Sequence, residues 1–354
     1  MRRAALLAGI AVTTALLIDA PVAGQQELVP ESALVAFRVD ANRVIATLKV
    51  RGSAERQVTQ GLSAEPIARY GYRHFDPPAS WREQDAAGMR EGDPWLIHAA
   101  PGQVFEAEAE RIVGGQAGCQ DATGVLLRVA SEQSGAFMAL PAKYFLAERS
   151  MTLPELKADS DSRVGVARSP RPAEFRRPLE AALNELLARE LPAFRTVAAP
   201  NLARAASSSV GYHRSWARQL QAVEDAMQSG RGELTYDVQS FRLAPDGVLL
   251  HFVRAEWTVQ RRQGFAVSLW LRGGQPLEVI QTNLRPALWL RSFEFQGKVA
   301  REHLGLILNI FDRDHDGWGE VLMAGSGYES TSLSLLEYSP SGFQPTGIEY
   351  GYGC

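Results

Sequence analysis

Four acidic side chains fall within nine positions of this 354-residue chain: Asp312, Asp314, Asp316 and Glu320. Carboxylates gathered in one shell repel each other by about 4 kcal/mol per pair at roughly 4 Å and an effective dielectric of about 20. A loop that brings them together therefore needs a cation. Hard oxygen donors at alternate positions, followed by the turn-forming Gly317, suit Ca²⁺. The plainer interpretation is a solvated Asp-Gly turn between two strands.

The spacing of the acids distinguishes two kinds of calcium loop. An EF-hand requires glutamate at its twelfth position, and with Asp312 as the first residue the twelfth is Met323. The stretch resembles instead the calcium-binding hairpin loop of FG-GAP repeats in integrin-type proteins. That resemblance implies as ligands the carbonyl of Trp318 and the side chains of Asp312, Asp314, Asp316 and Glu320. It is confined to residues 312–320, hereafter the acidic loop, and has no second copy, so it implies no propeller.

Residues 1–24 have the pattern of a secretory signal peptide. Arg2 and Arg3 precede an uncharged apolar run from Ala4 to Ile18, and the small residues Val22 and Gly24 predict cleavage after Gly24. An uncleaved anchor is the alternative, but the run is shorter than the roughly 20 residues that a spanning helix needs. We therefore expect an exported protein, periplasmic or extracellular, without an integral membrane segment after signal cleavage.

The chain contains two cysteines, Cys119 and Cys354. An even number in an oxidising compartment favours pairing. The disulfide would tie the C-terminus to the N-terminal half and close a very long loop, which stabilises the folded state. Two free thiols are the alternative.

The elements that must position the acidic loop are expected to be mostly β-strands. Residues 33–50 alternate apolar and polar around a turn, as in a β-hairpin. Further strands are expected at 103–113, 124–130 and 136–146, whereas 52–94 predicts long loops and short elements. Four prolines among residues 154–178 then indicate a connector.

Two helices are expected next, both with apolar stripes typical of core packing. The first begins near Phe175 and ends at Pro192, and the second runs from Ser207 to Gly230. From Arg231 onward we predict one antiparallel meander. Its strands are expected at 233–244, 247–260, 265–272, 276–282, 304–311, 319–325, 331–338 and 343–350.

The predicted fold class is α+β, predominantly antiparallel β with a helical segment between two β-rich parts. The predicted organisation is a signal peptide (1–24), a β-rich N-terminal domain (25–150), a linker with two helices (151–230) and an antiparallel β domain carrying the calcium loop (231–354).

No nucleophile elbow, P-loop, dinucleotide fingerprint or zinc-ligand spacing occurs in the chain. Paired carboxylates for glycoside cleavage could come from neighbouring C-terminal strands. The candidates are Asp237, Glu256 and Glu278. Aromatic residues near them could stack on sugars, although core packing is the simpler interpretation. These are Trp257, Trp270 and Trp289.

These patterns favour an exported, calcium-stabilised binding or structural protein without catalysis. The alternative is a secreted hydrolase, glycan-directed, that uses the C-terminal acids. A structural partner within an envelope complex is a third hypothesis, which a large exposed apolar patch would favour. The net charge of −3 gives no electrostatic reason to expect binding to nucleic acid or to an anionic membrane.

Overall fold

The computed structural model describes most of the chain from residue 33 to residue 353. All elements named below belong to one compact unit, Glu31–Cys354. The described residues are 33–51, 65–67, 72–117, 120–149, 164–169, 175–186, 188–189, 229, 233–259, 263–273, 277–286, 305–327 and 330–353. The predicted signal peptide, both cysteines and the predicted helix from Ser207 to Gly230 therefore lie outside the described residues, apart from Ser229.

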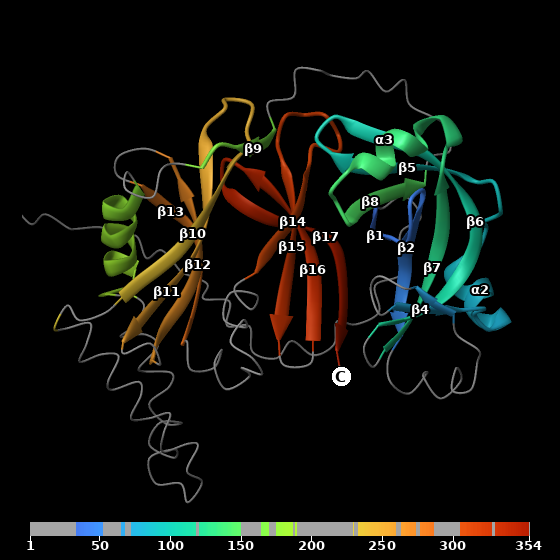
Figure 1. Ribbon diagram of the computed structural model, residues 1–354, viewed down its shortest axis with the longest axis horizontal. Helices are drawn as coiled ribbons and strands as arrows, with labels where there is room; N and C mark the ends of the chain where they lie inside the picture. Colours follow the sequence, from blue (N-terminus) through green and yellow to red (C-terminus); the bar gives the residue numbers. More distant parts are fainter. Residues whose placement is uncertain are drawn as a thin grey trace, which may run out of the picture. The chain divides into compact units, whose positions relative to one another are not determined.

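The N-terminal strands close into a six-stranded antiparallel barrel (Figure 1). The strands follow one another in the order β6-β5-β8-β1-β2-β7, and pairing of β6 with β7 closes the ring. A short hairpin of β3 and β4 extends the sheet beyond β6. The strands are β1 (Leu34–Arg38), β2 (Arg43–Arg51), β3 (Glu65–Ile67), β4 (Tyr72–Phe75), β5 (Pro94–Ala100), β6 (Gln103–Ala117), β7 (Gln120–Val129) and β8 (Tyr144–Arg149).

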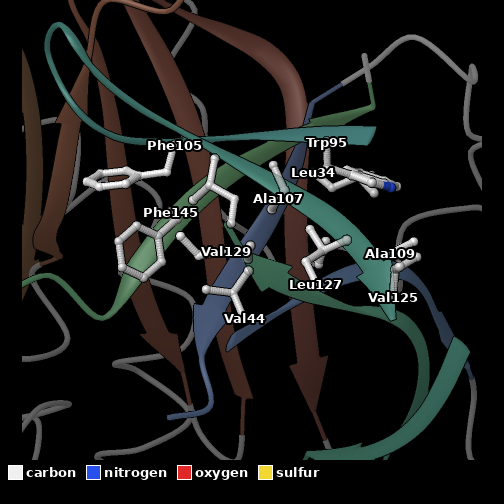
Figure 2. Packing of buried hydrophobic residues seen from close by; sticks show 14 of the residues in the cluster. Leu34, Val44, Trp95, Phe105, Ala107, Ala109, Val125, Leu127, Val129 and Phe145 are labelled. Atoms are coloured by element: carbon white, nitrogen blue, oxygen red, sulfur yellow. The ribbon is translucent and has the colours of Figure 1, made fainter. Parts of the chain in front are cut away.

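Side chains at alternate strand positions fill the barrel (Figure 2). Val44 on β2 and Leu127 on β7 are fully buried opposite each other, and Trp95 and Phe145 contribute larger rings. The predicted 33–50 hairpin is confirmed as β1 and β2, and the strands predicted at 103–113 and 124–130 are confirmed as β6 and β7. Strand β5 was not predicted, because Pro94 gave its start the appearance of a loop.

Of the strand predicted at 136–146, only the end is confirmed, as the start of β8, and the strand predicted before Tyr144 is wrong. Residues 131–133 form the short helix η1 (Ser131–Gln133), α3 (Ser134–Ala139) follows, and strand structure begins only at Tyr144. Pro141 separates the two elements because it lacks an amide donor. The ring of Phe137 on α3 is fully buried against Phe105 and Phe145, at 5.2 and 5.1 Å between centroids. The apolar run thus fills the barrel as a helix and not as a strand.

Charged side chains are buried where α2 (Ala79–Asp85) meets the barrel. Arg51 forms an ion pair with Asp85, and the two side chains are only 1% and 2% exposed. The guanidinium of Arg51 also lies 4.1 Å from the ring centroid of Trp81, and Lys49 Nζ lies 4.0 Å from Asp85. Burial of charge is tolerated here because each charge has an opposite neighbour.

The strands after residue 164 form two further antiparallel sheets, so the prediction of one C-terminal meander is wrong. The five-stranded sheet has the order β13-β12-β11-β10-β9, and the four-stranded sheet has the order β14-β15-β16-β17. Their strands are β9 (Gly165–Ala167), β10 (Glu233–Arg242), β11 (Leu249–Val259), β12 (Gln263–Arg272), β13 (Glu278–Pro286), β14 (Leu306–Phe311), β15 (Glu320–Gly327), β16 (Ser330–Ser339) and β17 (Gly342–Gly353). The eight strands predicted from residue 233 onward are all present, from β10 to β17.

The four-stranded sheet is buried on both faces. Its strands are therefore as apolar as those of the five-stranded sheet, and the sequence pattern does not mark where one sheet ends and the next begins. Ile310 and Val321 pack with Phe252 and Trp270 of the five-stranded sheet. Their chain neighbours Phe311 and Leu322 pack with Val35 and Leu146 of the barrel. Successive residues of a strand point to opposite faces, so the sheet has two apolar faces and covers two partners.

Residues 175–186 form a helix, which confirms the first part of the predicted helix from Phe175 to Pro192. Its apolar stripe packs on the other face of the five-stranded sheet, as predicted for a core helix. The fold is mostly antiparallel β with short helical elements, and the predicted fold class is confirmed. The domain boundaries stay a prediction. No described helix is long and apolar enough to cross a membrane.

Candidate metal centre

The acidic loop is the connection between β14 and β15. Phe311 and Glu320 form the last pair of the β14–β15 ladder, so the chain must reverse within residues 312–319. His315 and Gly317 make the reversal with positive φ values of 59° and 84°. Aspartate side chains stabilise such turns because their oxygens accept backbone N–H groups nearby. Here Trp318 N–H donates to Asp316 Oδ1 at 2.7 Å.

The three aspartates of the loop converge. Asp312, Asp314 and Asp316 each offer a carboxylate oxygen, and these oxygens lie within 4.8 Å of one another. Asp312 is 3% exposed, whereas the other two are exposed. Oxygens this close together can be drawn around one hard cation, and aspartate carboxylates are ligands that Ca²⁺ prefers. The donor set therefore fits the predicted metal.

Glu320 stands apart from this group of three. Its carboxylate accepts a hydrogen bond from Arg313 N–H at 3.0 Å, and Arg313 Nε lies 3.7 Å from its other oxygen. To bind the ion, the Glu320 carboxylate would have to give up part of its contact with Arg313. No contact in the described part of the chain involves the carbonyl of Trp318. Glu320 and Trp318 are therefore still predicted as ligands only from the resemblance to FG-GAP loops.

The loop carries groups that resist ionisation. Burial raises the pKa of Glu320 to about 7, and the neighbouring charge of Asp314 acts in the same direction. The pKa of the exposed Asp316 is also raised, first by partial loss of hydration in the loop and then by the charges of Asp314 and Asp312. A cation beside these carboxylates favours their charged forms and lowers both pKa values.

The acidic loop packs on the turn between β10 and β11. Gly319 N–H donates to the carbonyl of Leu243 at 3.0 Å. A Cβ atom at Gly319 would come within 2.8 Å of Leu243 Cδ2, and one at Gly317 within 3.2 Å of Pro245. The ring of Trp318 lies 6.0 Å from that of Tyr338 on β16. Close backbone approach thus explains a glycine in a loop that joins two apolar strands.

Strand β14, which leads into the loop, is fixed to the barrel. Asn309 Nδ2 donates to the carbonyls of Ala99 and Tyr144 at 2.6 and 2.9 Å. On the barrel strand β8, the pKa of Glu148 is lowered, chiefly by its contact with His98 on β5 and further by the charge of Arg313 in the acidic loop. Sequence reasoning missed Asn309 and Arg313. For Arg313, the one signal in the sequence was its position between two aspartates, which indicates a role among the loop carboxylates.

Two of the three acids considered for glycoside cleavage form ion pairs. Asp237 pairs with Arg254, and Glu278 lies 3.4 Å from Arg272. The register places Glu256 on the same face of the sheet as Asp237, two residues along from Arg254. No contact in the described part of the chain marks these acids as a catalytic pair.

The tryptophans considered for stacking on sugars divide by burial. Trp270 is 2% exposed and packs against Phe241, Phe252 and Phe343, which confirms the core interpretation for this residue. The side chains of Trp257 and Trp289 lie outside the described residues.

Comparisons with known proteins add no assignment. No protein-family model, curated protein or solved structure matches the chain. The convergence of the three aspartates is therefore the observation from which a function can be argued.

Proposed function

We propose that this is an exported binding or structural protein stabilised by a calcium ion in the acidic loop. The observation that carries the proposal is the convergence of Asp312, Asp314 and Asp316 within 4.8 Å. Resemblance to FG-GAP loops supports adding the side chain of Glu320 and the carbonyl of Trp318 as ligands. Export is supported by the pattern of residues 1–24.

The role proposed for the ion is structural. It offsets repulsion among the loop carboxylates and holds them in one arrangement. The same loop donates a hydrogen bond to Leu243 at its Gly319 amide and packs Trp318 near Tyr338. A rigid loop therefore steadies the contact between the four-stranded and the five-stranded sheet.

Thermal melting of the protein with calcium, with magnesium or with a chelator tests the proposal. We expect calcium to raise the melting temperature, since a ligand that binds only the native state stabilises it by about 2.7 kcal/mol at 100 times its Kd. Magnesium should have a smaller effect, because it gives up its water shell reluctantly. A terbium ion in the same site should show luminescence sensitised by the nearby Trp318.

Matched variants identify the site. Asp314→Ala/Asp316→Ala should lose both the calcium response and the terbium signal. Glu91→Ala removes an exposed acid of the barrel region and should keep both. A double variant that still melts higher with calcium would overturn the assignment of the ion to this loop.

A further inference from the structure

His251 on β11 is a buried histidine that the calcium proposal does not use. It is 6% exposed and faces the helix formed by residues 175–186. Its ring lies 5.1 Å from the ring of Phe175, the first described residue of that helix, in an edge-on arrangement. His251 Nδ1 lies 2.9 Å from the hydroxyl of Ser240, a residue with no exposed surface. The helix thus closes over an imidazole.

The surroundings of His251 offer little to a positive charge. Its strand neighbours are Ser240 on β10 and Leu271 on β12, and Ser240 in turn pairs with Ala167 on β9. Among the described charged residues of the elements packed against it, Arg168 after β9, Arg242 on β10, and Arg176, Arg177 and Glu185 on the helix are exposed, whereas Glu180 is half-buried. Arg242 lies on the same face of the sheet as Ser240, two residues along β10. Arg176 and Glu180 are bonded to each other at 2.8 Å.

The electrostatic consequence follows from this burial. Desolvation lowers the pKa of His251, because a charged imidazole loses its hydration in an apolar site. Lifting the helix would expose the ring to water and return its pKa toward 6.5. A form with the helix lifted would therefore bind protons more readily than the packed form, and acid would favour it.

We propose that the helix 175–186 is a pH-sensitive cover of the five-stranded sheet, which mild acid loosens by protonating His251. Lifting the helix uncovers an apolar sheet face. That face contains Val253, Ala255, Val267, Leu269 and Leu271. The device needs no metal and is separate from the acidic loop, which packs on the other side of this sheet through Leu243 and Pro245.

Amide hydrogen exchange of the helix at pH 7.5 and pH 5.0 tests the proposal, with calcium chelated so that the acidic loop does not contribute. After correction for intrinsic rates, the opening constant of residues 175–186 should rise by about 5- to 30-fold at pH 5.0. The upper value applies if His251 has a pKa of about 6.5 when the helix is lifted and stays neutral when the helix is packed. An unchanged opening constant would overturn the proposal.

Two variants separate His251 from other titrating groups. His251→Gln keeps a hydrogen-bonding side chain beside Ser240 but does not titrate, so the opening constant should become independent of pH. His98→Gln removes another buried histidine, which lies near Glu148 on the barrel, and should keep the full response. A pH response that survives in His251→Gln, or disappears in His98→Gln, would contradict the assignment.

A measurement on the unaltered protein covers the case in which His251→Gln does not fold. Hydrogen exchange at the imidazole carbon between the two nitrogens reports the pKa of each histidine separately. We expect His251 to titrate below 6.5, the ordinary value. A value at or above 6.5 would overturn the proposal.

Discussion

The α2 end of the barrel and the acidic loop arrange charged side chains differently: opposite charges are paired at the barrel, and like charges converge in the loop. At the barrel, Arg51 and Asp85 are almost fully buried and neutralise each other, with Trp81 against the guanidinium. The acidic loop has four carboxylates and one arginine, and that arginine contacts Glu320. Charge buried with its own partner is a matter of folding, whereas converging like charges indicate a partner from solution.

The largest effect should come from breaking the buried pair at the barrel. Arg51→Met leaves Asp85 buried without its main partner, which should lower the free energy of unfolding by about 3–5 kcal/mol. Urea denaturation at neutral pH measures this loss. A loss below 1 kcal/mol would mean that water or Lys49 replaces Arg51 as the partner of Asp85. The carboxylate of Asp85 would then be more accessible to solvent than its 2% exposed side chain indicates.

A smaller loss is expected where the acidic loop packs on the five-stranded sheet. Gly319→Ala places a Cβ atom 2.8 Å from Leu243, and forced repacking of this kind costs about 1–3 kcal/mol. Gly135→Ala on α3 is the matched control, because nothing lies within 4 Å of its Cβ position. The free energies of unfolding of the two variants should differ by more than 1 kcal/mol. Equal values would show that the loop is not tightly packed there.

The pH dependence of the calcium-free protein should show the unfavourable burial of Glu320. Its folded pKa of about 7 lies above its ordinary 4.5, so the folded state binds the proton more tightly. This contribution to stability is full below pH 4.5 and is lost as the pH rises to about 7. Between pH 5 and pH 7.5 the loss should be on the order of 2 kcal/mol.

Urea denaturation in chelator at pH 5 and pH 7.5 checks this slope, with Glu320→Gln as the comparison. The variant cannot ionise at this position, so the Glu320 part of the slope should be absent. Identical slopes for the variant and the unaltered protein would assign the pH dependence to other groups.

The smallest effect is expected on the barrel surface. Arg128 Nη2 lies 2.9 Å from Glu110, but the arginine side chain is 58% exposed. Pairs of this kind contribute about 0.2–1 kcal/mol, so Arg128→Ala should change the free energy of unfolding by at most about 1 kcal/mol. A loss as large as that of Arg51→Met would remove the distinction between buried and exposed charge on which the comparison depends.

Periodicity in the sequence predicts the strands better than their assembly. Alternation and turn residues located β10 to β17, because both signals are local. Division of these strands between two sheets depends on contacts such as Ile310 with Trp270 and Phe311 with Val35, which lie far apart in the chain. The helix of Phe137 was missed because its apolar run suits either a strand or a helix.

The acidic loop could be predicted from the sequence because its candidate ligands lie within nine positions of the chain. Spacing alone predicted that Asp312, Asp314 and Asp316 come together. The contact of Arg313 with Glu320, and the Ser240 partner of His251, depend on strand register and packing. No spacing rule anticipates them.

The amide of Asn309 has a consequence for how the protein can be divided. It supplies a donor to each of two carbonyls, at Ala99 and Tyr144, beyond the last β5–β8 pair, His98 with Leu146. A barrel produced without residues 306–353 would turn those carbonyls toward water and uncover Val35 and Leu146. Strands β14 to β17 thus complete the packing of one side of the barrel, and a variant that lacks them should have a less stable barrel.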